Sequence, residues 1–224
     1  MDIEPIADFH CPLTSKFGLP RQSRVVNELE GTIVFRKQYC SEDAIRGLEG
    51  FDHLWLIWGF SANRKTGWQA TVRPPRLGGN KTMGVFATRS PYRPNPLGLS
   101  AVKISRIENG RIHVLGADLM DGTPIYDIKP YIAYADSIPD AKGGFTDETQ
   151  WKELEVIFPD ELKVKAEKIC GKGTAKEIEA LLAQDPRPHY QDDPEKVYGM
   201  TFGNSDIKFS VKESTLTIHE IVKN

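Results

Sequence analysis

The segment from Ala87 to Ser100 (ATRSPYRPNPLGLS) holds the least ordinary combination of chemical groups in the chain. Three prolines within six residues fix φ and remove amide donors, which predicts a stiff loop rather than a helix. This loop carries Arg89, Arg93 and Asn95. Because a rigid loop can aim a guanidinium, it can bind a carboxylate or phosphate through two parallel hydrogen bonds. A structural loop that closes one end of a domain is the alternative, but surface loops carry sites so often that we favour the functional interpretation.

A second segment, residues 118–131 (DLMDGTPIYDIKPY), supplies the carboxylates of Asp118, Asp121 and Asp127. They follow a predicted strand at Arg111–Leu115 and are expected to cluster where that strand ends. Carboxylates gathered in this way can accept hydrogen bonds from amines and hydroxyls, or act as a general base. Asp121 and Gly122 alone would suit any tight turn, so the group, rather than Asp121 by itself, indicates function.

Positive charge is concentrated in one part of the chain. The formal net charge is -2, yet residues 53–107 contain no Asp or Glu. The basic residues of this block are Arg64, Lys65, Arg73, Arg76, Lys81, Arg89, Arg93, Lys103 and Arg106. The block favours a localised anionic partner, which is either nucleic acid or a small phosphate or carboxylate; a solvated face balanced by acidic residues elsewhere is the alternative. Residues 73–81 could follow a phosphate backbone, with Trp68 as a stacking face, or form a plain surface hairpin.

The common hydrolase, zinc and Rossmann classes have little support, because their motifs are missing. The chain has no phosphate-binding G-x-x-x-x-G-K-[ST], no G-x-G-x-x-G after a strand, no H-E-x-x-H and no G-x-S-x-G. Its three cysteines cannot build a disulfide framework or a four-cysteine zinc site, and no metal is expected. The first residues, MDIEPIADFH, lack the basic start and apolar run of a signal peptide, and no run approaches the ~20 apolar residues of a membrane helix. A cytoplasmic location is therefore expected.

Short strands must position these groups. The sequence predicts strands at 31–35, 54–60, 83–88, 101–107 and 111–115, with a hairpin turn at Asn109-Gly110. The apolar run 54–60 (LWLIWGF) suits a strand buried on both faces. A short helix at 41–47 is expected to begin at Ser41 and stop at Gly47. Strands this short and close favour a sheet that closes into a barrel over residues 1–150, so the fold class is mainly β.

After about Asp147 the pattern changes to a small α+β unit, residues 151–224. Amphipathic helices are predicted at 159–169 and 174–184, the second capped by Thr174 with Glu177. Strands at 196–202, 206–212 and 214–222 are predicted to form a three-stranded antiparallel sheet. A unit of this size is expected to lean on the larger domain.

Taken together, these segments resemble the TsaA-like family, also called TrmO. The matching stretches cover nearly the whole chain, and they are FGLPRQ at 17–22, GLEGFDHLW at 47–55, VRPPRLGG at 72–79, MGVFATRS at 83–90, RPNPLG at 93–98, DGTP at 121–124, DIKPY at 127–131, and QDPRP at 184–188 with Tyr190. The resemblance implies a non-Rossmann β-barrel that binds S-adenosylmethionine and methylates tRNA. The implied reaction places a methyl group on N6 of N6-threonylcarbamoyladenosine at position 37 of threonine tRNA.

The resemblance also assigns residues to the cofactor. The implied contacts are Cys11, Pro12, Leu13, Asp52, His53, Arg89, Leu99, Asp118, Leu119, Met120 and Asp121. Cys11 and Leu13 depart from the serine and tyrosine common in the family, and Asp52 replaces a frequent serine. Contacts through backbone atoms would tolerate the changes at Cys11 and Leu13.

At the transfer site we expect Arg89 to fix the cofactor or acceptor and Asn95 to hydrogen-bond the acceptor base. Asp121 or Asp127 is expected to take up the N6 proton. The residues expected to contact RNA are Arg64, Lys65, Arg73, Arg76, Lys81 and Arg93. A homodimer is expected, because the family is generally dimeric and the apolar strands offer edges and surface to a second copy. The alternatives are a methyltransferase of this fold for another anionic acceptor, or a binding module for RNA or S-adenosylmethionine without turnover.

Overall fold

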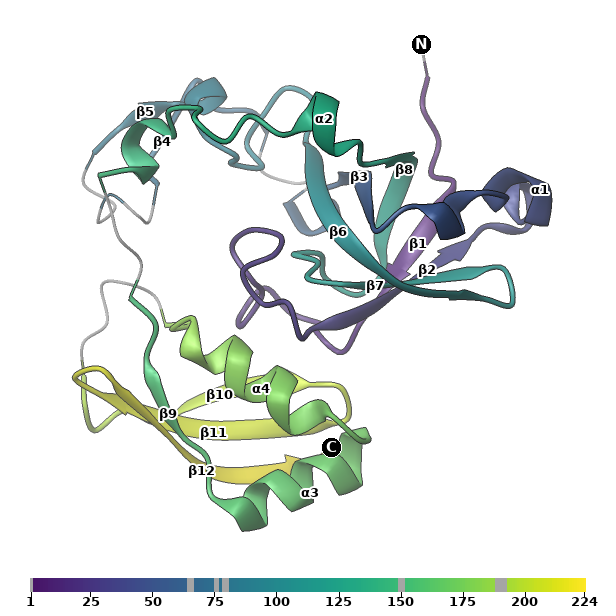
Figure 1. Cartoon of the computed structure of the whole chain (residues 1–224). Helices are drawn as coiled ribbons and strands as arrows, with labels where there is room; N and C mark the ends of the chain where they lie inside the picture. Colours follow the sequence, from purple (N-terminus) through teal and green to yellow (C-terminus); the bar gives the residue numbers. More distant parts are fainter. Residues whose placement is uncertain (1, 64–66, 75–76, 78–80, 149–151, 188–192) are drawn as a thin grey trace.

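The computed structural model describes residues 2–63, 67–74, 77, 81–148, 152–187 and 193–224 (Figure 1). A closed β-barrel forms the first part, and a four-stranded sheet covered by two helices forms the second. The predicted fold class, mainly β with an α+β extension, is confirmed. Among the described residues, no helix combines the length and the apolar character needed to cross a membrane.

Six strands close the barrel in the order β1-β2-β7-β6-β3-β8. Their bounds are β1 Ala7–His10, β2 Glu30–Phe35, β3 His53–Gly59, β6 Leu97–Glu108, β7 Arg111–Leu115 and β8 Thr123–Pro130. Every neighbouring pair is antiparallel. The long strand β6 pairs with β3 through its first half and with β7 through its second. Closure leaves no free sheet edge among these strands.

Strand β3 buries one face, which corrects the expectation of burial on both faces. Leu54, Leu56 and Trp58 point into the barrel core, while Trp55 and Ile57 lie on its outer side. An antiparallel sheet with one wet face requires this alternation. A Cβ on Gly98 would meet the Trp58 ring at 2.2 Å, so the barrel accepts the indole only because position 98 is glycine.

The predicted hairpin between β6 and β7 is confirmed. Asn109 and Gly110 both have positive φ, 51° and 69°, as a two-residue turn of this kind requires. The predicted strand at 83–88 is wrong after its first two residues. Residues 83–84 form strand β5 (Met83–Gly84), which pairs with β4 (Thr71–Val72). A 3-10 turn follows at Val85–Ala87. Val85 is buried by that turn, which explains the apolar pattern without a strand.

Short helices flank the barrel strands. Helix α1 covers Glu42–Ile45, with Ser41 at its N-cap position as predicted, and Gly47 adopts the left-handed conformation after it. Helix α2 covers Ala133–Asp136. It is tied to the barrel wall because Trp55 Nε1 donates to Asp136 Oδ2 at 3.0 Å.

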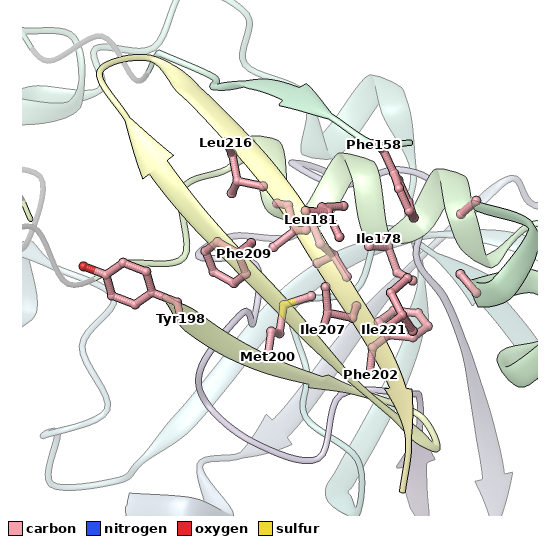
Figure 2. Close-up of a cluster of buried hydrophobic side chains, with 14 of the residues drawn as sticks. Phe158, Ile178, Leu181, Tyr198, Met200, Phe202, Ile207, Phe209, Leu216 and Ile221 are labelled. Atoms are coloured by element: carbon pink, nitrogen blue, oxygen red, sulfur yellow. The ribbon is translucent and has the colours of Figure 1, made fainter. Parts of the chain in front are cut away.

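The second part has one strand more than the sequence predicts. Strands β10 (Tyr198–Phe202), β11 (Ser205–Lys212) and β12 (Thr215–Lys223) form the expected antiparallel set, and β9 (Glu155–Ile157) adds a parallel edge beside β12. Three residues are too few to show a strand pattern, so β9 forms only because β12 is there to pair with it. Helices α3 (Asp160–Cys170) and α4 (Thr174–Ala183) cover the sheet, and apolar side chains fill the space between them (Figure 2).

The cap of α4 differs from the predicted capping box. Gly173, with φ of 91°, takes the N-cap position, and Thr174 is the first helical residue. The Thr174 hydroxyl donates to the Gly171 carbonyl at 2.5 Å instead of capping the helix. The backbone turn at Gly171–Gly173 therefore begins the helix. Glu177 does not take part in a capping box with Thr174.

The barrel and the second part share a core. Leu13, Val26 and Leu29, from the segment between β1 and β2, are buried in the same cluster as α4 and β10. The Gly203 amide, in the turn between β10 and β11, donates to the Pro12 carbonyl at 2.7 Å. The second part thus packs directly against the segment that follows β1.

Candidate functional site

Two of the predicted cofactor segments meet at one end of the barrel. Cys11–Leu13 leaves β1, and residues 118–122 precede β8, which pairs with β1. The Asp121 amide donates to the Leu13 carbonyl at 2.8 Å, and the Gly122 amide donates to the Phe9 carbonyl at 2.8 Å. The structure therefore brings together seven of the residues named from the sequence.

The side chains of this pair of segments point in different directions. Leu13 and Leu119 are fully buried, so only their backbone atoms can contact a ligand. The Cys11 thiol donates to the Leu119 carbonyl at 3.3 Å, and burial raises its pKa to about 12. A thiol with so high a pKa is not a nucleophile at neutral pH. Substitutions at positions 11 and 13 are thus compatible with a ligand that contacts the backbone.

Asp121 carries the carboxylate closest to this junction. Its Oδ1 lies 3.1 Å from His10 Nδ1 and accepts the Cys11 amide at 3.2 Å. Both contacts use the same oxygen, and the Asp121 side chain keeps 37% of its surface exposed. His10 was not identified from the sequence, because a lone histidine at the end of a short strand carries no spacing signal.

Asp118 has a different environment, although it lies only three residues away. Its Oδ1 accepts the Ser100 hydroxyl at 2.5 Å, and Ser100 in turn accepts Trp58 Nε1 at 2.9 Å. Burial raises the pKa of Asp118, while the Ser100 bond and the positive charge of Arg89 oppose that rise. The pKa of Asp118 is shifted upward on balance, because burial outweighs the Ser100 bond and the charge of Arg89.

Arg89 stands beside Asp118 on the predicted stiff loop. It is exposed, and its Nη1 donates to Gln22 Oε1 at 2.5 Å. Gln22 belongs to the FGLPRQ motif at residues 17–22. The family resemblance includes this motif but implies no role for Gln22. Gln22, Arg89 and Asp118 form a polar set, in which Arg89 contacts Gln22 and acts electrostatically on Asp118.

Asp127 does not join the other two aspartates, which corrects the expectation that all three cluster. It lies within β8, opposite Ile57 of β3 and therefore on the outer face of the barrel. Its carboxylate forms an ion pair with Lys129 Nζ at 2.8 Å. Leu99 faces Ile57 from the other side and is 55% exposed, so it belongs to the same outer face.

Asp52 and His53 lie at the start of β3. Asp52 is exposed, and its carbonyl accepts the Ile104 amide at 2.7 Å. His53 pairs with Lys103 across β6, and burial together with the charge of Arg24 lowers the pKa of its imidazole. A neutral ring at this position can accept a hydrogen bond from a ligand near physiological pH.

Asn95 and Arg93 have separate surroundings within the proline loop. Asn95 is exposed and lines a cavity of about 410 Å³ together with Phe60 and Tyr126. Arg93 Nη1 donates to the carbonyls of Val85 and Thr88 at 3.1 and 2.7 Å. Arg93 thus holds the loop in shape, a role the sequence did not indicate.

The structure describes only some of the residues predicted to contact RNA. Arg73 and Lys81 are exposed, and Trp68 exposes 57% of its surface beside them along the chain. Arg64, Lys65 and Arg76, together with Pro188 and Tyr190 of the last motif, lie outside the described residues. Within the parts of the chain that the structure describes, no group of three His, Cys, Asp or Glu side chains is arranged to hold a metal ion.

Glu177 of α4 faces the barrel across the shared core. Burial, aided by the charge of Glu30, raises the pKa of Glu177 to about 7, well above its ordinary 4.5. A carboxyl whose pKa is raised by folding contributes full stability below pH 4.5, and that contribution is lost as the pH rises through about 7.

Glu177→Gln should therefore raise the free energy of unfolding at pH 8 by about 2 kcal/mol, after allowance for partial exposure, and leave it nearly unchanged at pH 4. Denaturant titrations at the two pH values measure this. Glu179→Gln, which removes the carboxylate that pairs with Lys163 of α3, is the control and should not raise the free energy of unfolding at pH 8. Equal effects of the two substitutions at pH 8 would contradict the prediction.

Known protein families and relatives match this chain over nearly its whole length. Residues 8–137 match the family model described as tRNA-methyltransferase O N-terminal domain, and residues 151–224 match the TrmO C-terminal domain. The tRNA (adenine(37)-N6)-methyltransferase of Escherichia coli is 40% identical over 220 residues, covering 94% of this chain and 93% of that protein. The protein of the same name from Mus musculus is 43% identical over 136 residues, which are 60% of this chain and 31% of the mouse protein.

A solved structure gives the same result in three dimensions. The crystal structure of TrmO from Pseudomonas aeruginosa superimposes with a TM-score of 0.82 at 28% identity, covering 99% of this chain and 98% of that one. Both parts of the chain match models of one family, and relatives and structures of that family extend over nearly its whole length. This chain therefore belongs to the TrmO family of tRNA methyltransferases.

Proposed function

We propose that this protein transfers a methyl group from S-adenosylmethionine to N6 of N6-threonylcarbamoyladenosine at position 37 of threonine tRNA. Relatives named tRNA (adenine(37)-N6)-methyltransferase support methylation of N6 at adenosine 37. A relative from Pseudomonas aeruginosa named a putative S-adenosylmethionine-dependent methyltransferase supports the donor. The threonylcarbamoyl group and the threonine tRNA are the finer part of the proposal, and they rest on the sequence resemblance.

The observation that carries the proposal is the packing of Asp121 against the backbone of Cys11–Leu13, with Asp118 three residues before it under the charge of Arg89. The charges and hydrogen-bonding capacity of these groups suit S-adenosylmethionine, the methyl donor. A guanidinium suits the carboxylate of the amino acid part, and the carboxylate of Asp118 suits its ammonium group or hydroxyls. When bound, S-adenosylmethionine supplies an electrophilic methyl group on a sulfonium. The closed barrel, which is not a Rossmann fold, explains why the chain has no glycine fingerprint.

The chain's own residues have two further tasks in this proposal. Asp121, whose Oδ1 is held by His10 and the Cys11 amide, takes up the N6 proton as the methyl group arrives. Asn95, exposed in the cavity with Phe60 and Tyr126, hydrogen-bonds the acceptor base. Asp127 is the weaker candidate for the base, because Lys129 already pairs with its carboxylate.

The test is mass spectrometry of nucleosides from threonine tRNA incubated with the purified protein and S-adenosylmethionine. The expected product is N6-threonylcarbamoyladenosine one methyl group heavier, and only when both components are present. A methylated unmodified adenosine would retain the enzyme class and reject the threonylcarbamoyl substrate. Tight binding of tRNA without any product would favour the non-catalytic module.

Binding of tRNA should weaken steeply as salt rises, because basic residues of the 53–107 block neutralise phosphates and release counterions. Arg73→Gln and Lys81→Gln should each reduce the slope of log affinity against log salt by about one unit or slightly less. Lys165→Gln, an exposed lysine on α3, is the matched control. An affinity that does not vary with salt would show that the block is only a solvated face.

We also propose that the protein is a homodimer. The sequence-based expectation of a dimer rested partly on the apolar strands. Leu54, Leu56 and Trp58 of LWLIWGF cannot contribute to a dimer surface, because they are buried inside the barrel. Exposed apolar side chains lie elsewhere, at Tyr134 (92% exposed) and Ile138 (72%). Light scattering at micromolar concentration should give twice the chain mass of 25.2 kDa, and the mass of a single chain would contradict the dimer.

A further inference from the structure

A buried chain of hydrogen bonds inside the barrel ends on a residue of the candidate site. Trp58 of β3 and Ser100 of β6 lie on paired strands and expose 7% and 1% of their surface. Trp58 Nε1 donates to Ser100 Oγ at 2.9 Å, and Ser100 Oγ donates to Asp118 Oδ1 at 2.5 Å. Asp118 lies on the segment between β7 and β8, so three separate parts of the barrel meet in this chain of bonds.

The direction of each bond follows from the chemistry of its groups. An indole N–H can only donate, so the Ser100 oxygen must accept from Trp58. That leaves the single hydroxyl hydrogen of Ser100 for Asp118 Oδ1. If Asp118 were protonated on this oxygen, Ser100 would accept two hydrogens and its own hydrogen would lose its acceptor at a buried position. The bonds from Trp58 to Ser100 and on to Asp118 therefore favour the ionised carboxylate.

The indole is held in place by the strand opposite it. Gly98 is the direct partner of Trp58 in the pairing of β3 with β6, and a Cβ on Gly98 would meet the indole ring at 2.2 Å. The centroid of the Phe60 ring lies 4.4 Å from that of Trp58. The position of the indole fixes the direction of the Ser100 hydroxyl, and through it the position of the Asp118 carboxylate.

The other groups that act on Asp118 come from neighbouring segments. The charge of Arg89, on the proline loop, and the backbone of Ser23, between β1 and β2, lower the pKa of Asp118, as the Ser100 bond does. Burial raises this pKa by more. Asp121 follows on the same segment, three residues later. Loss of the Ser100 bond should therefore raise the pKa of Asp118 further.

We propose that Trp58 and Ser100 are positioning residues for the methyl donor, and that they hold the ionised carboxylate of Asp118 where it accepts a hydrogen bond from S-adenosylmethionine. This inference rests on the proposed function and adds two residues of the barrel core to it. The donor has two kinds of group with the required chemistry, its ammonium group and its ribose hydroxyls. A carboxylate already fixed in place binds either group with a smaller loss of freedom than a mobile one.

The first experiment measures the affinity of the full-length protein for S-adenosylmethionine by calorimetry at several pH values. Ser100→Ala should raise the Kd about tenfold near pH 7, as expected for the loss of a hydrogen bond to a charged group. The affinity of Ser100→Ala should also begin to fall at a higher pH than that of the wild type during acidification, because Asp118 is protonated more readily. Ser105→Ala, an exposed serine on the same strand, is the control and should change neither quantity.

Trp58→Phe removes the indole N–H and keeps an aromatic ring. It should weaken binding in the same direction as Ser100→Ala but by less, because the Ser100 hydroxyl can still reach Asp118. The indole N–H resonance of Trp58 gives a second readout in the wild-type protein. It should shift when S-adenosylmethionine binds, and this shift should be lost in Ser100→Ala. The wild-type resonance decides the question if Ser100→Ala does not fold.

Binding of 5′-methylthioadenosine identifies the group that Asp118 accepts, because this molecule keeps the ribose and lacks the ammonium group. If Asp118 binds the ammonium group, Ser100→Ala weakens only S-adenosylmethionine; if it binds the ribose, both ligands weaken equally. Normal affinity and pH dependence in Ser100→Ala, with a Trp58 resonance that does not respond to the donor, would overturn this inference alone. A wild-type protein that does not bind S-adenosylmethionine would overturn the proposed function.

Discussion

Asp121→Asn should lower kcat for methyl transfer by about 100- to 10,000-fold, the range in which a general base contributes. N6 of the proposed acceptor belongs to a urea-like group, so it is a poor nucleophile until its proton is shared. Asparagine keeps the shape and the Oδ1 acceptor that hold His10 and the Cys11 amide, but it cannot take up a proton. Single-turnover transfer measures the loss, and calorimetry should show nearly unchanged affinity for S-adenosylmethionine.

Asp127→Asn is the matched control, since it makes the same change on the outer face of the barrel beside Lys129. We expect near-normal turnover. A large loss in Asp127→Asn with normal turnover in Asp121→Asn would assign the base to Asp127. Normal turnover in both would remove a carboxylate base from the mechanism, and the proton would then go to water or to the acceptor's own carboxylate.

Arg89→Ala should weaken binding of S-adenosylmethionine about 100-fold, which corresponds to the loss of two hydrogen bonds to a charged group. The same change removes the positive charge that opposes the burial of Asp118, so the pKa of Asp118 should rise further. The loss of the guanidinium and the higher pKa of Asp118 both weaken the binding of a charged ligand at this site. Isothermal calorimetry with S-adenosylmethionine and with its demethylated product measures the affinity directly.

Arg89→Lys should restore little of the affinity, because an ammonium cannot bond Gln22 and a carboxylate with the planar geometry of a guanidinium. Arg111→Ala, an exposed arginine on β7, is the control and should bind like the wild type. If Arg89→Ala binds the donor normally and loses affinity for tRNA instead, Arg89 serves the acceptor and the donor assignment fails.

Much of the site could be named from the sequence because its residues occur in motifs with unusual composition. The prolines of residues 87–100 predict a loop, and that loop holds Arg89 beside Asp118. The partners of these residues could not be named. His10 is found as a partner only when β1 packs beside Asp121, and Gln22 only when the proline loop brings Arg89 to it.

The predicted clustering of Asp127 with Asp121 was wrong, because strand pairing decides the face on which a side chain lies. Asp121 and Asp127 are six residues apart, yet β8 begins between them and carries Asp127 to the outer face of the barrel. The period of two along a strand is fixed, but which face is buried depends on the partner strand. No pattern within residues 118–131 contains that information.

The sequence by itself determined the class of fold, the hairpin at Asn109-Gly110, the helices α3 and α4, and the family. These follow from local chemistry, since positive φ, helical periodicity and motif residues are properties of a few neighbouring positions. Only the tertiary structure decided the order of the strands in the barrel, the pairing of β9 with β12, and the packing of Leu13, Val26 and Leu29 in one core with α4. Each depends on contacts between residues far apart in the chain, whose free energy appears only when both partners are already folded.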